Sequence, residues 1–374
     1  MLVKPISEIL DNPAQMKALD PGDMLGLTVD FPNQCRRGAE LGRQFERDIR
    51  PQTSIQNIVV TGMGGSAIGG DILRCLIEEA GVVPLSVNRG YDLPGYVGSH
   101  TLVIAASYSG NTEETLASYR AAHSRRAQVA VITSGGALAE LARKDKVPLC
   151  IIPGGQPPRA STGYLFFPAL IYLISRGGVN RDLSGDIDES LQLMAKMRTE
   201  LGPEAPTVNN EAKTIAEQLY RRLPIIYGSQ DYGAVAALRW RTQINENSKC
   251  LAFPYAFPEM NHNEILGWTL AHKLQSRNFA TVILQDPSEL EKTLPGSDPR
   301  RRIGRRIEVT KDLIHRATRL INVVARGESL LSRMLSLIYL GDFTSVYLAY
   351  LNQIDPTNID NINILKAKMA KLRS

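Results

Sequence analysis

Short apolar runs alternate with segments of helical periodicity along most of the chain. The first series of runs predicts buried parallel strands at 57–61, 83–87, 101–107, 128–133 and 147–152, with helices in the gaps. A second series begins after a loop-rich, helix-bearing connection around 180–206, with strands at 223–228, 249–253, 279–285 and 319–325. Strands that alternate with helices form a parallel sheet covered on both faces. We therefore predict an α/β protein with two doubly wound parallel-sheet domains, each an αβα sandwich.

The two series open alike, which favours two domains of one topology. Ile-Val-Val-Thr-Gly at 58–62 is echoed by Pro-Ile-Ile-Tyr-Gly at 224–228, and each leads into a helix of small residues. A chain of 374 residues is also long for a single hydrophobic core. We place a helical segment that packs on the domains at 1–50, the first domain at 51–190, and the second domain with the C-terminal helices at 207–374.

A glycine-rich turn follows the first predicted strand and opens a helix. Gly62 and Gly64 suit the G-x-G opening of a dinucleotide-binding fingerprint. That fingerprint also needs an acidic residue at the tip of the next strand, and the strand at 83–87 ends without one. No G-x-x-x-x-G-K-[ST] run occurs either. We therefore expect Gly65 and Ser66 to hold a small phosphorylated ligand rather than a nucleotide.

Three hydroxyl side chains lie at the end of the strand predicted at 101–107 and just beyond it, namely Ser107, Ser109 and Thr112. They precede a helix, where free backbone N–H groups and the positive dipole end favour a phosphate. The alternative is an ordinary helix cap, a common role of Ser and Thr. Because ligands of doubly wound sheets bind at the carboxyl ends of the strands, we expect this loop and Ser66 to form one phosphate site in the first domain.

Charge and composition argue against several other classes of function. The net charge is +5, and the one dense basic block, at 300–306, has no interleaved aromatic residues. We interpret this block as a solvated helix face rather than a nucleic-acid site. The four cysteines form no C-x-x-C pair, which predicts a reducing, cytoplasmic setting and no zinc site. We expect no membrane partner, because we find no signal-peptide pattern and no window near the roughly 20 apolar residues that span a bilayer.

Several further segments carry a family resemblance, together with the two turns at 64–67 and 107–115. They are 156–164 with Arg159, 239–249 with Glu246, 258–265 with His262, and the C-terminal 355–357 and 364–366. With these segments the chain resembles the sugar isomerase (SIS) domain proteins, and more closely the bifunctional phosphoglucose/phosphomannose isomerases of archaea and bacteria. The resemblance covers nearly the whole chain, in the right order.

The resemblance implies an aldose–ketose isomerase. Such an enzyme interconverts glucose 6-phosphate, and also mannose 6-phosphate, with fructose 6-phosphate through a cis-enediolate. The family's ligand is a hexose 6-phosphate, and it needs no metal and no organic cofactor. The family's phosphate-binding positions fall on Gly65, Ser66, Ser107, Ser109 and Thr112. The alternatives are a non-catalytic sugar-phosphate-binding protein and another SIS-domain isomerase.

The family pattern also implies four catalytic residues. Glu246 would be the base, Arg159 would stabilise the enediolate, and His262 would move a proton between ring O5 and O1. Lys366 would assist ring opening. The family's histidine comes from the neighbouring subunit, so the resemblance implies a homodimer with His262 contributed across the interface. Thr357 is the candidate for the small residue that leaves room for either epimer at C2.

Each of these residues also has a plainer interpretation. A glutamate at a helix end is most often solvated, and a loop arginine most often lies on the surface. A single histidine is most often structural, and Lys366 by itself is one of many C-terminal lysines. Glu259 and Glu264 rival Glu246 on residue type alone, and only the family pattern decides between them.

Overall fold

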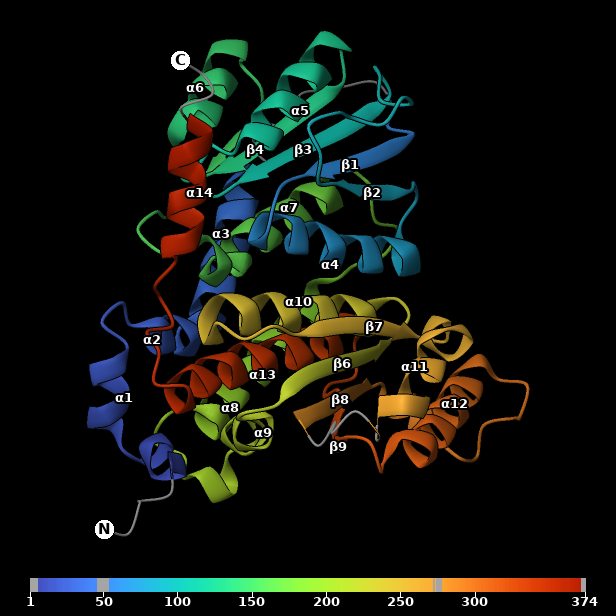
Figure 1. The fold of residues 1–374 in the computed structure, drawn as a ribbon. Coiled ribbons are helices and arrows are strands. Elements are labelled where there is room, and N and C mark those ends of the chain that lie inside the picture. Colours follow the sequence, from blue (N-terminus) through green and yellow to red (C-terminus); the bar gives the residue numbers. More distant parts are fainter. Residues whose placement is uncertain (1–5, 46–53, 272, 274–277, 371–374) are drawn as a thin grey trace. The chain divides into compact units, whose positions relative to one another are not determined.

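The computed structural model describes residues 6–45, 54–271, 273 and 278–370 (Figure 1). The chain forms two compact units, each built around its own parallel sheet. The first-sheet unit comprises Val29–Lys196 and Ala325–Ser336. The second-sheet unit comprises the residues up to Thr28, Met197–Val324 and the residues from Leu337 onward.

The first-sheet unit contains a five-stranded sheet in the order β2-β1-β3-β4-β5, in which all neighbours are parallel. Its strands are β1 (Asn57–Thr61), β2 (Leu85–Asn88), β3 (Thr101–Ser107), β4 (Gln128–Thr133) and β5 (Leu149–Ile151). Its helices are α3 (Phe31–Phe45), α4 (Gly65–Ala80), α5 (Glu113–Ser124), α6 (Gly136–Asp145), the 3-10 turn η3 (Pro158–Ala160), α7 (Thr162–Ser175) and most of α8 (Ser184–Leu201).

Helices cover both faces of this sheet, as its continuously apolar strands require. On one face, Val103 and Val131 share a core with Tyr119 of α5 and Leu138 of α6. Helices α4 and α7 lie on the other face (Figure 1).

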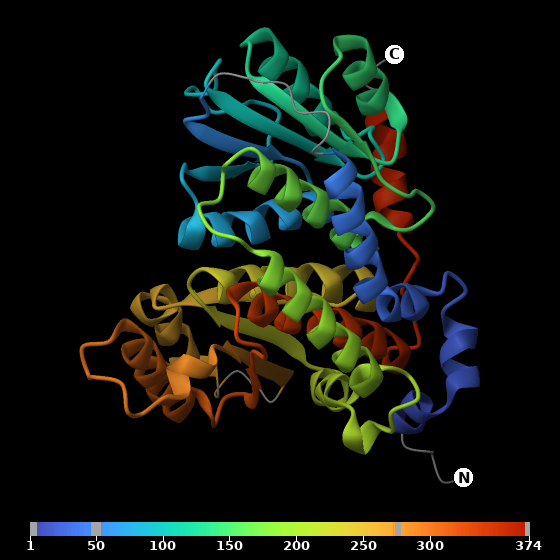
Figure 2. The same cartoon turned by 180° about the vertical axis from the view of Figure 1, so that it is seen from behind.

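Helix α3 runs alongside α7 (Figure 2), and glycines allow the two helices to approach closely. An ideal Cβ at Gly38 would lie 2.6 Å from the carbonyl oxygen of Gly163. A larger residue would force the helices apart, so this contact fixes the start of α7 and the segment that precedes it.

The second-sheet unit contains a four-stranded parallel sheet in the order β7-β6-β8-β9. Its strands are β6 (Leu223–Ser229), β7 (Phe253–Phe257), β8 (Phe279–Gln285) and β9 (Arg319–Val324). Its helices are α1 (Pro13–Leu19), most of α2 (Met24–Val29), α9 (Glu211–Leu219), α10 (Tyr232–Ser248), α11 (Glu264–Ala271), α12 (Pro299–Ile314), most of α13 (Leu330–Leu351) and α14 (Asp360–Ala370). The 3-10 turns η1 (Ile6–Asp11), η4 (Thr207–Asn209), η5 (Glu259–His262) and η7 (Pro287–Leu290) also belong to it.

Buried polar contacts join α10 to α13. Arg239 forms a two-pronged ion pair with Asp342, at 3.0 and 2.9 Å, and Trp240 Nε1 donates to the carbonyl oxygen of Leu337 at 2.8 Å. Gly341 makes room for the indole, because an ideal Cβ there would lie 2.3 Å from its nitrogen. Removing one partner of a buried ion pair leaves an uncompensated charge. These contacts therefore fix the position of α10 on α13.

The predicted fold class is confirmed: the chain contains two parallel-sheet α/β domains, and the order β2-β1-β3-β4 of one sheet matches β7-β6-β8-β9 of the other. The strand predicted at 249–253 is wrong. Helix α10 continues to Ser248, and Lys249 ends it with a φ of 51°. The strand of that region is β7, which begins at Phe253. The other predicted strands agree with the structure to within two residues at each end.

The unit boundaries differ from the predicted domain boundaries. The predicted boundary at 50/51 lies outside the described residues, and the segment before it is divided between the units. Helix α3 joins the first sheet through its contact with α7. The turn before α2 joins the second-sheet unit, because Asp20 accepts hydrogen bonds from the Met24 amide at 2.9 Å and from the Tyr350 hydroxyl at 2.8 Å.

Helix α13 is long and apolar enough to cross a membrane, which the sequence analysis did not anticipate. Its apolar window is entirely buried inside the protein. A core helix of a folded domain has this pattern, and the buried contacts of Asp342 agree with that role.

Candidate functional site

The glycine-rich turn lies between β1 and α4, at the carboxyl end of β1. Gly64 is the residue before the helix, with φ 52° and ψ −123°, and no side chain caps the helix start. Gly62 lies against the tip of β3, since an ideal Cβ there would lie 2.8 Å from the carbonyl oxygen of Ala106. Ser66, in the first turn of α4, is buried. The turn therefore offers uncapped amides and one hydroxyl beside the end of β3.

The hydroxyl loop follows β3 directly. Ser107 Oγ lies 3.0 Å from Thr112 Oγ1 and accepts a hydrogen bond from the Gly110 amide at 3.2 Å. Thr112 precedes α5 but does not cap it, so the first amides of this helix lack a side-chain acceptor from that position. Ser109 is exposed, and its hydroxyl accepts from the Asn111 amide at 3.3 Å. Two uncapped helix starts thus meet near hydroxyl groups, which is the arrangement that binds phosphates.

The hydroxyl loop is anchored to the neighbouring start of α6. The side-chain oxygen of Asn111 accepts from the Ala137 amide at 3.1 Å, and the carbonyl oxygen of Gly110 accepts from the Leu138 amide at 2.9 Å. Gly110 has a φ of 68°, and an ideal Cβ there would lie 1.8 Å from the carbonyl oxygen of Gly135. The backbone of the loop is therefore fixed without help from a ligand.

Arg159 lies in η3, beside the glycine-rich turn. It is buried, with 3% of its surface exposed, which rules out a freely solvated loop arginine. An ideal Cβ at Gly65 would lie 2.8 Å from the carbonyl oxygen of Pro158 and 3.4 Å from Cα of Arg159. The fold therefore brings Arg159 to the start of α4, close to Ser66.

Two residues that the sequence analysis missed hold the Arg159 segment. Gln34 of α3 donates to the carbonyl oxygen of Ala160 at 2.7 Å and accepts from the Gly163 amide at 2.8 Å. The hydroxyl of Tyr108 accepts from the Gln156 amide at 3.1 Å. Tyr108 stands inside the motif that identified the hydroxyl loop, whereas nothing in the sequence around Gln34 indicates its role.

The second sheet has an equivalent turn, but its side chains are acidic. Asp231 precedes α10 with φ 70° and ψ −124°, nearly the angles of Gly64 before α4. Asp286 and Glu289 follow β8 where the first sheet has its hydroxyl loop after β3. The carboxylates of Asp231 and Asp286 at this position repel a phosphate. The first sheet is therefore the better candidate for phosphate binding.

Glu246 lies in the last turn of α10 and is half-buried. Its neighbours in the sequence are structural: Asn247 donates to Ser345 Oγ at 2.9 Å, and Ser248 donates to the carbonyl oxygen of Ser345 at 2.6 Å. Lys249 donates to the carbonyl oxygen of Glu246 at 2.8 Å. These three hydrogen bonds fix the end of the helix, and they use the backbone carbonyl oxygen of Glu246 rather than its carboxylate.

His262 and Glu246 lie at opposite edges of the second sheet. Helix α10 starts at the carboxyl edge, where the Gln230 amide bonds to the carbonyl oxygen of Phe257, and it runs back toward the other edge. From Tyr232 to Glu246 the helix spans about 14 residues, or roughly 21 Å. His262 follows β7 in η5 at the carboxyl edge, and it is exposed. The two side chains do not meet within one chain.

The two C-terminal candidate residues, Thr357 and Lys366, follow the end of α13. Lys249 Nζ also donates to the carbonyl oxygen of Pro356 at 2.9 Å, which places the 356–357 segment beside the end of α10. Thr357 packs on Gly22, where an ideal Cβ would lie 2.4 Å from its hydroxyl oxygen. Lys366 lies on α14 and is exposed. Among the residues that the structure describes, no group of three or more His, Cys, Asp or Glu is placed to hold a metal ion.

Two family models match this chain. The SIS domain matches residues 53–164, and the bacterial phospho-glucose isomerase C-terminal SIS domain matches residues 208–369. A curated bifunctional phosphoglucose/phosphomannose isomerase from Caldicellulosiruptor bescii is 41% identical over 94% of this chain and 100% of its own length. The chain belongs to the bifunctional phosphoglucose/phosphomannose isomerase family.

Two further relatives and one solved structure are similar to this chain. The isomerase of the same name from Thermoplasma volcanium is 35% identical over 84% of this chain and 91% of its own length. A D-glucosamine-6-phosphate 4-epimerase from Sulfolobus acidocaldarius is 33% identical over 64% of this chain and 72% of its own length. The crystal structure of hypothetical protein TT0462 from Thermus thermophilus has a TM-score of 0.76 and 17% identity, covering 99% of this chain and 95% of that chain, which supports the fold alone.

We predict that Gly110→Ala destabilises the protein more than Gly177→Ala. The two glycines have φ values of 68° and 69°, so alanine costs about 1–2 kcal/mol at either position. Nothing lies within 4 Å of a Cβ at Gly177, whereas at Gly110 the Cβ would meet the carbonyl oxygen of Gly135. We expect a further loss of about 1–3 kcal/mol for Gly110→Ala, measured as the free energy of unfolding in urea. Equal losses in the two variants would contradict the close contact described for the hydroxyl loop.

We also predict a specific effect of Glu289 on the pH dependence of stability. Burial raises the pKa of Glu289 to about 7 from its ordinary value of 4.5. Between these values the folded state keeps a proton that the unfolded state has lost, so the contribution of Glu289 to stability falls as the pH rises. The difference in unfolding free energy between the native protein and Glu289→Gln should fall by up to about 3 kcal/mol from pH 4.5 to 7.

The control for this measurement is Glu308→Gln, in the same unit. The Glu308 side chain is 52% exposed, and its removal should leave the pH profile nearly unchanged. A flat difference for Glu289→Gln would show that the Glu289 carboxyl titrates alike in both states.

Proposed function

We propose that this protein is an aldose–ketose isomerase that interconverts glucose 6-phosphate and mannose 6-phosphate with fructose 6-phosphate. The 41% identity to a bifunctional phosphoglucose/phosphomannose isomerase, over that relative's whole length, carries the proposal. The uncapped turns of the first sheet support it, because a sugar phosphate needs such an anchor. The two aldoses differ only at C2 and yield the same enediol, so one base serves both if the pocket leaves room.

The phosphate of the sugar would bind at the turn before α4 and at the hydroxyl loop. We assign its ligands to the amides and hydroxyls of five residues, namely Gly65, Ser66, Ser107, Ser109 and Thr112. The anchored backbone supports this assignment, because preformed donors need no reorganisation when the anion arrives. Holding the phosphate also restricts the motion of the reacting carbons.

Glu246 would act as the base that transfers the proton between C1 and C2. The carboxylate removes the proton from C2 of the aldose, and the resulting enediolate takes a proton at C1 to give the ketose. Arg159 is the proposed partner of the enediolate oxygen, since a buried guanidinium next to the phosphate turn supplies fixed positive charge. Thr357 lies on the segment tied to the end of α10, which supports a role near C2.

Ring opening would use His262 and Lys366. His262 moves a proton between O5 and O1, and Lys366 assists at the ring oxygen. The separation of Glu246 from His262 along α10 supports a homodimer, in which each active site takes His262 from the partner chain. Three buried cysteines and the absence of a disulfide among the described residues support a cytoplasmic setting.

We predict that Glu246→Gln lowers kcat by about 10²–10⁴, the range that a positioned general base contributes. The purified full-length protein is incubated with fructose 6-phosphate in D2O, and the products are identified by NMR. The native protein should yield glucose 6-phosphate and mannose 6-phosphate that carry deuterium at C2. Glu140→Gln, on the exposed face of α6, is the matched control and should keep full activity. Turnover by the Glu246→Gln variant at the native rate would rule out Glu246 as the base. In a separate incubation with glucosamine 6-phosphate, formation of the 4-epimer would favour the activity named for the Sulfolobus relative.

A second prediction tests the shared site. Glu246→Gln and His262→Gln homodimers should each be inactive, and mixing them should restore activity. A mixed dimer has one site with both substitutions and one site with neither, so random exchange should return about a quarter of native activity. Subunit exchange is monitored by mass spectrometry. Mixtures that have exchanged subunits but stay inactive would place both residues of one site in the same chain.

A further inference from the structure

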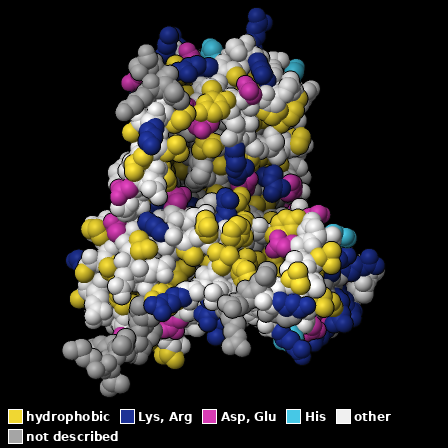
Figure 3. Space-filling model, viewed as in Figure 1, with side chains coloured by type: hydrophobic (Ala, Val, Ile, Leu, Met, Phe, Trp, Pro, Cys, Tyr) yellow, Lys and Arg dark blue, Asp and Glu magenta, His cyan; other side chains and the backbone are white. Residues whose placement is uncertain are grey.

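The basic block of α12 is a concentrated patch of arginines that the proposed isomerase activity does not use. Arg301, Arg302, Arg305 and Arg306 are exposed on the first half of the helix, and dark-blue side chains gather over this part of the second-sheet unit (Figure 3). Like charges four residues apart on a helix destabilise it. Arg301 and Arg305 form one such pair, and Arg302 and Arg306 form another. The native helix therefore carries repulsion that an anion would relieve.

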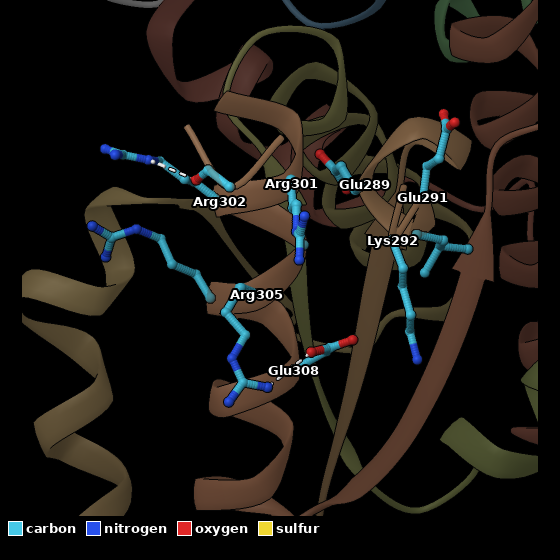
Figure 4. Close-up of a pocket in the computed structure, with 11 residues that line it drawn as sticks. Glu289, Glu291, Lys292, Arg301, Arg302, Arg305 and Glu308 are labelled. Carbon is cyan, nitrogen blue, oxygen red and sulfur yellow. Dashed lines mark hydrogen bonds and ion pairs between the residues drawn. The ribbon is translucent and has the colours of Figure 1, made fainter. Parts of the chain in front are cut away.

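These arginines line a cavity of about 740 Å³ between α12 and the segment that follows β8 (Figure 4). This volume falls within the range of small-molecule sites. Lys292, from the segment after η7, adds a fifth cation to the lining. Within the described part of the chain, Lys292 and Arg306 make no hydrogen bond or ion pair through their side chains.

The carboxylates of the same cavity already have partners. Glu289 accepts hydrogen bonds from the Ser229 hydroxyl and from the Asp286 amide, Glu291 accepts from Thr293, and Glu308 pairs with Arg305 at 3.0 Å. The cations outnumber these carboxylates by five to three. The surplus charge of the cavity is therefore positive.

The walls of the cavity are held in place by the protein itself. Arg301 donates to the carbonyl oxygen of Leu294, and Arg302 donates to that of Gly296 at 3.3 Å, which ties the loop before α12 to the helix. An ideal Cβ at Gly304 would lie 1.9 Å from the carbonyl oxygen of Glu289, so α12 touches the η7 segment closely. A preformed cavity binds an anion without the cost of ordering a loop.

We infer that this cavity is a binding site for a small, multiply charged phosphate compound, such as an oligophosphate chain. Guanidinium groups bind phosphate oxygens in pairs, and several of them around one cavity suit several phosphate groups. The lining contains no aromatic side chain on which a base could stack, which disfavours single-stranded nucleic acid. The site lies in the second-sheet unit, on different residues from the proposed substrate phosphate site, and it does not depend on the proposed activity.

The test is isothermal titration calorimetry, in which the full-length protein is titrated with inorganic tripolyphosphate at fixed ionic strength. Fructose 6-phosphate is present in excess, so that the turns of the first sheet are occupied if they bind sugar phosphate. We expect saturable binding of one tripolyphosphate per chain, and at least tenfold weaker binding by the double variant Arg301→Gln/Arg305→Gln. The matched control is Arg143→Gln/Lys144→Gln, which removes two exposed positive charges from α6 and should change the affinity less than twofold.

The outcomes separate the proposal from its rivals. A second double variant, Lys292→Gln/Arg306→Gln, removes the two unpartnered cations without touching the contacts to Leu294 and Gly296, and it should weaken binding similarly. Equal weakening by the α6 control, binding with no saturation, or no binding at all would overturn the proposal. Tight binding of a single-stranded RNA oligonucleotide with no measurable affinity for tripolyphosphate would also overturn it, in favour of a nucleic-acid surface.

Discussion

Backbone atoms approach each other at Gly65 and Gly110 more closely than any side chain would permit, and the candidate site depends on these two contacts. A Cβ at Gly65 would lie 2.8 Å from the carbonyl oxygen of Pro158, and one at Gly110 would lie 1.8 Å from that of Gly135. The first contact joins the turn before α4 to the Arg159 segment, and the second locks the hydroxyl loop onto α6. The donors of this edge are therefore set by the main chain, and they lose little conformational freedom when an anion binds.

The two sheets share a strand order, yet only one keeps a turn suited to an anion. Asp231 adopts nearly the backbone angles of Gly64, so the geometry of the turn is preserved in the second sheet. The carboxylate of Asp231, with that of Asp286 after β8, reverses the charge of that edge. A duplicated fold can thus retain its topology through packing while the chemistry at the strand ends diverges, because fold and site depend on different residues.

Most of the fold follows from local patterns, and the exceptions have physical causes. The strands and the two turns are recognisable because burial on both faces demands continuous apolar runs and because tight turns demand glycine. The end of α10 is not recognisable, because Asn247 and Ser248 stabilise the helix through α13, about 100 residues away in the sequence.

The same limit applies to the candidate site. Ser66, Ser107 and Thr112 can be recognised from their positions at or after the end of a strand, because neighbouring residues in the sequence form that site. The role of Gln34 depends on helix packing across more than 100 residues, for it bonds to Ala160 and Gly163. The roles of Arg159, Glu246 and His262 came only from family resemblance, because a single charged residue has no local pattern that separates catalysis from solvation.

Helix α10 also constrains how a complete active site can be built. Its first turn lies at the carboxyl edge of the second sheet, and its last turn, with Glu246, lies roughly 21 Å away along the helix axis. The ion pair of Arg239 with Asp342 holds the middle of the helix, and the Lys249 cap holds its end, so a bend of the helix cannot bring Glu246 to His262. If both residues act on one sugar, as proposed, the second must come from another chain. Dimerisation would then be part of the chemistry, because the rigidity that positions Glu246 is what prevents one chain from closing the site alone.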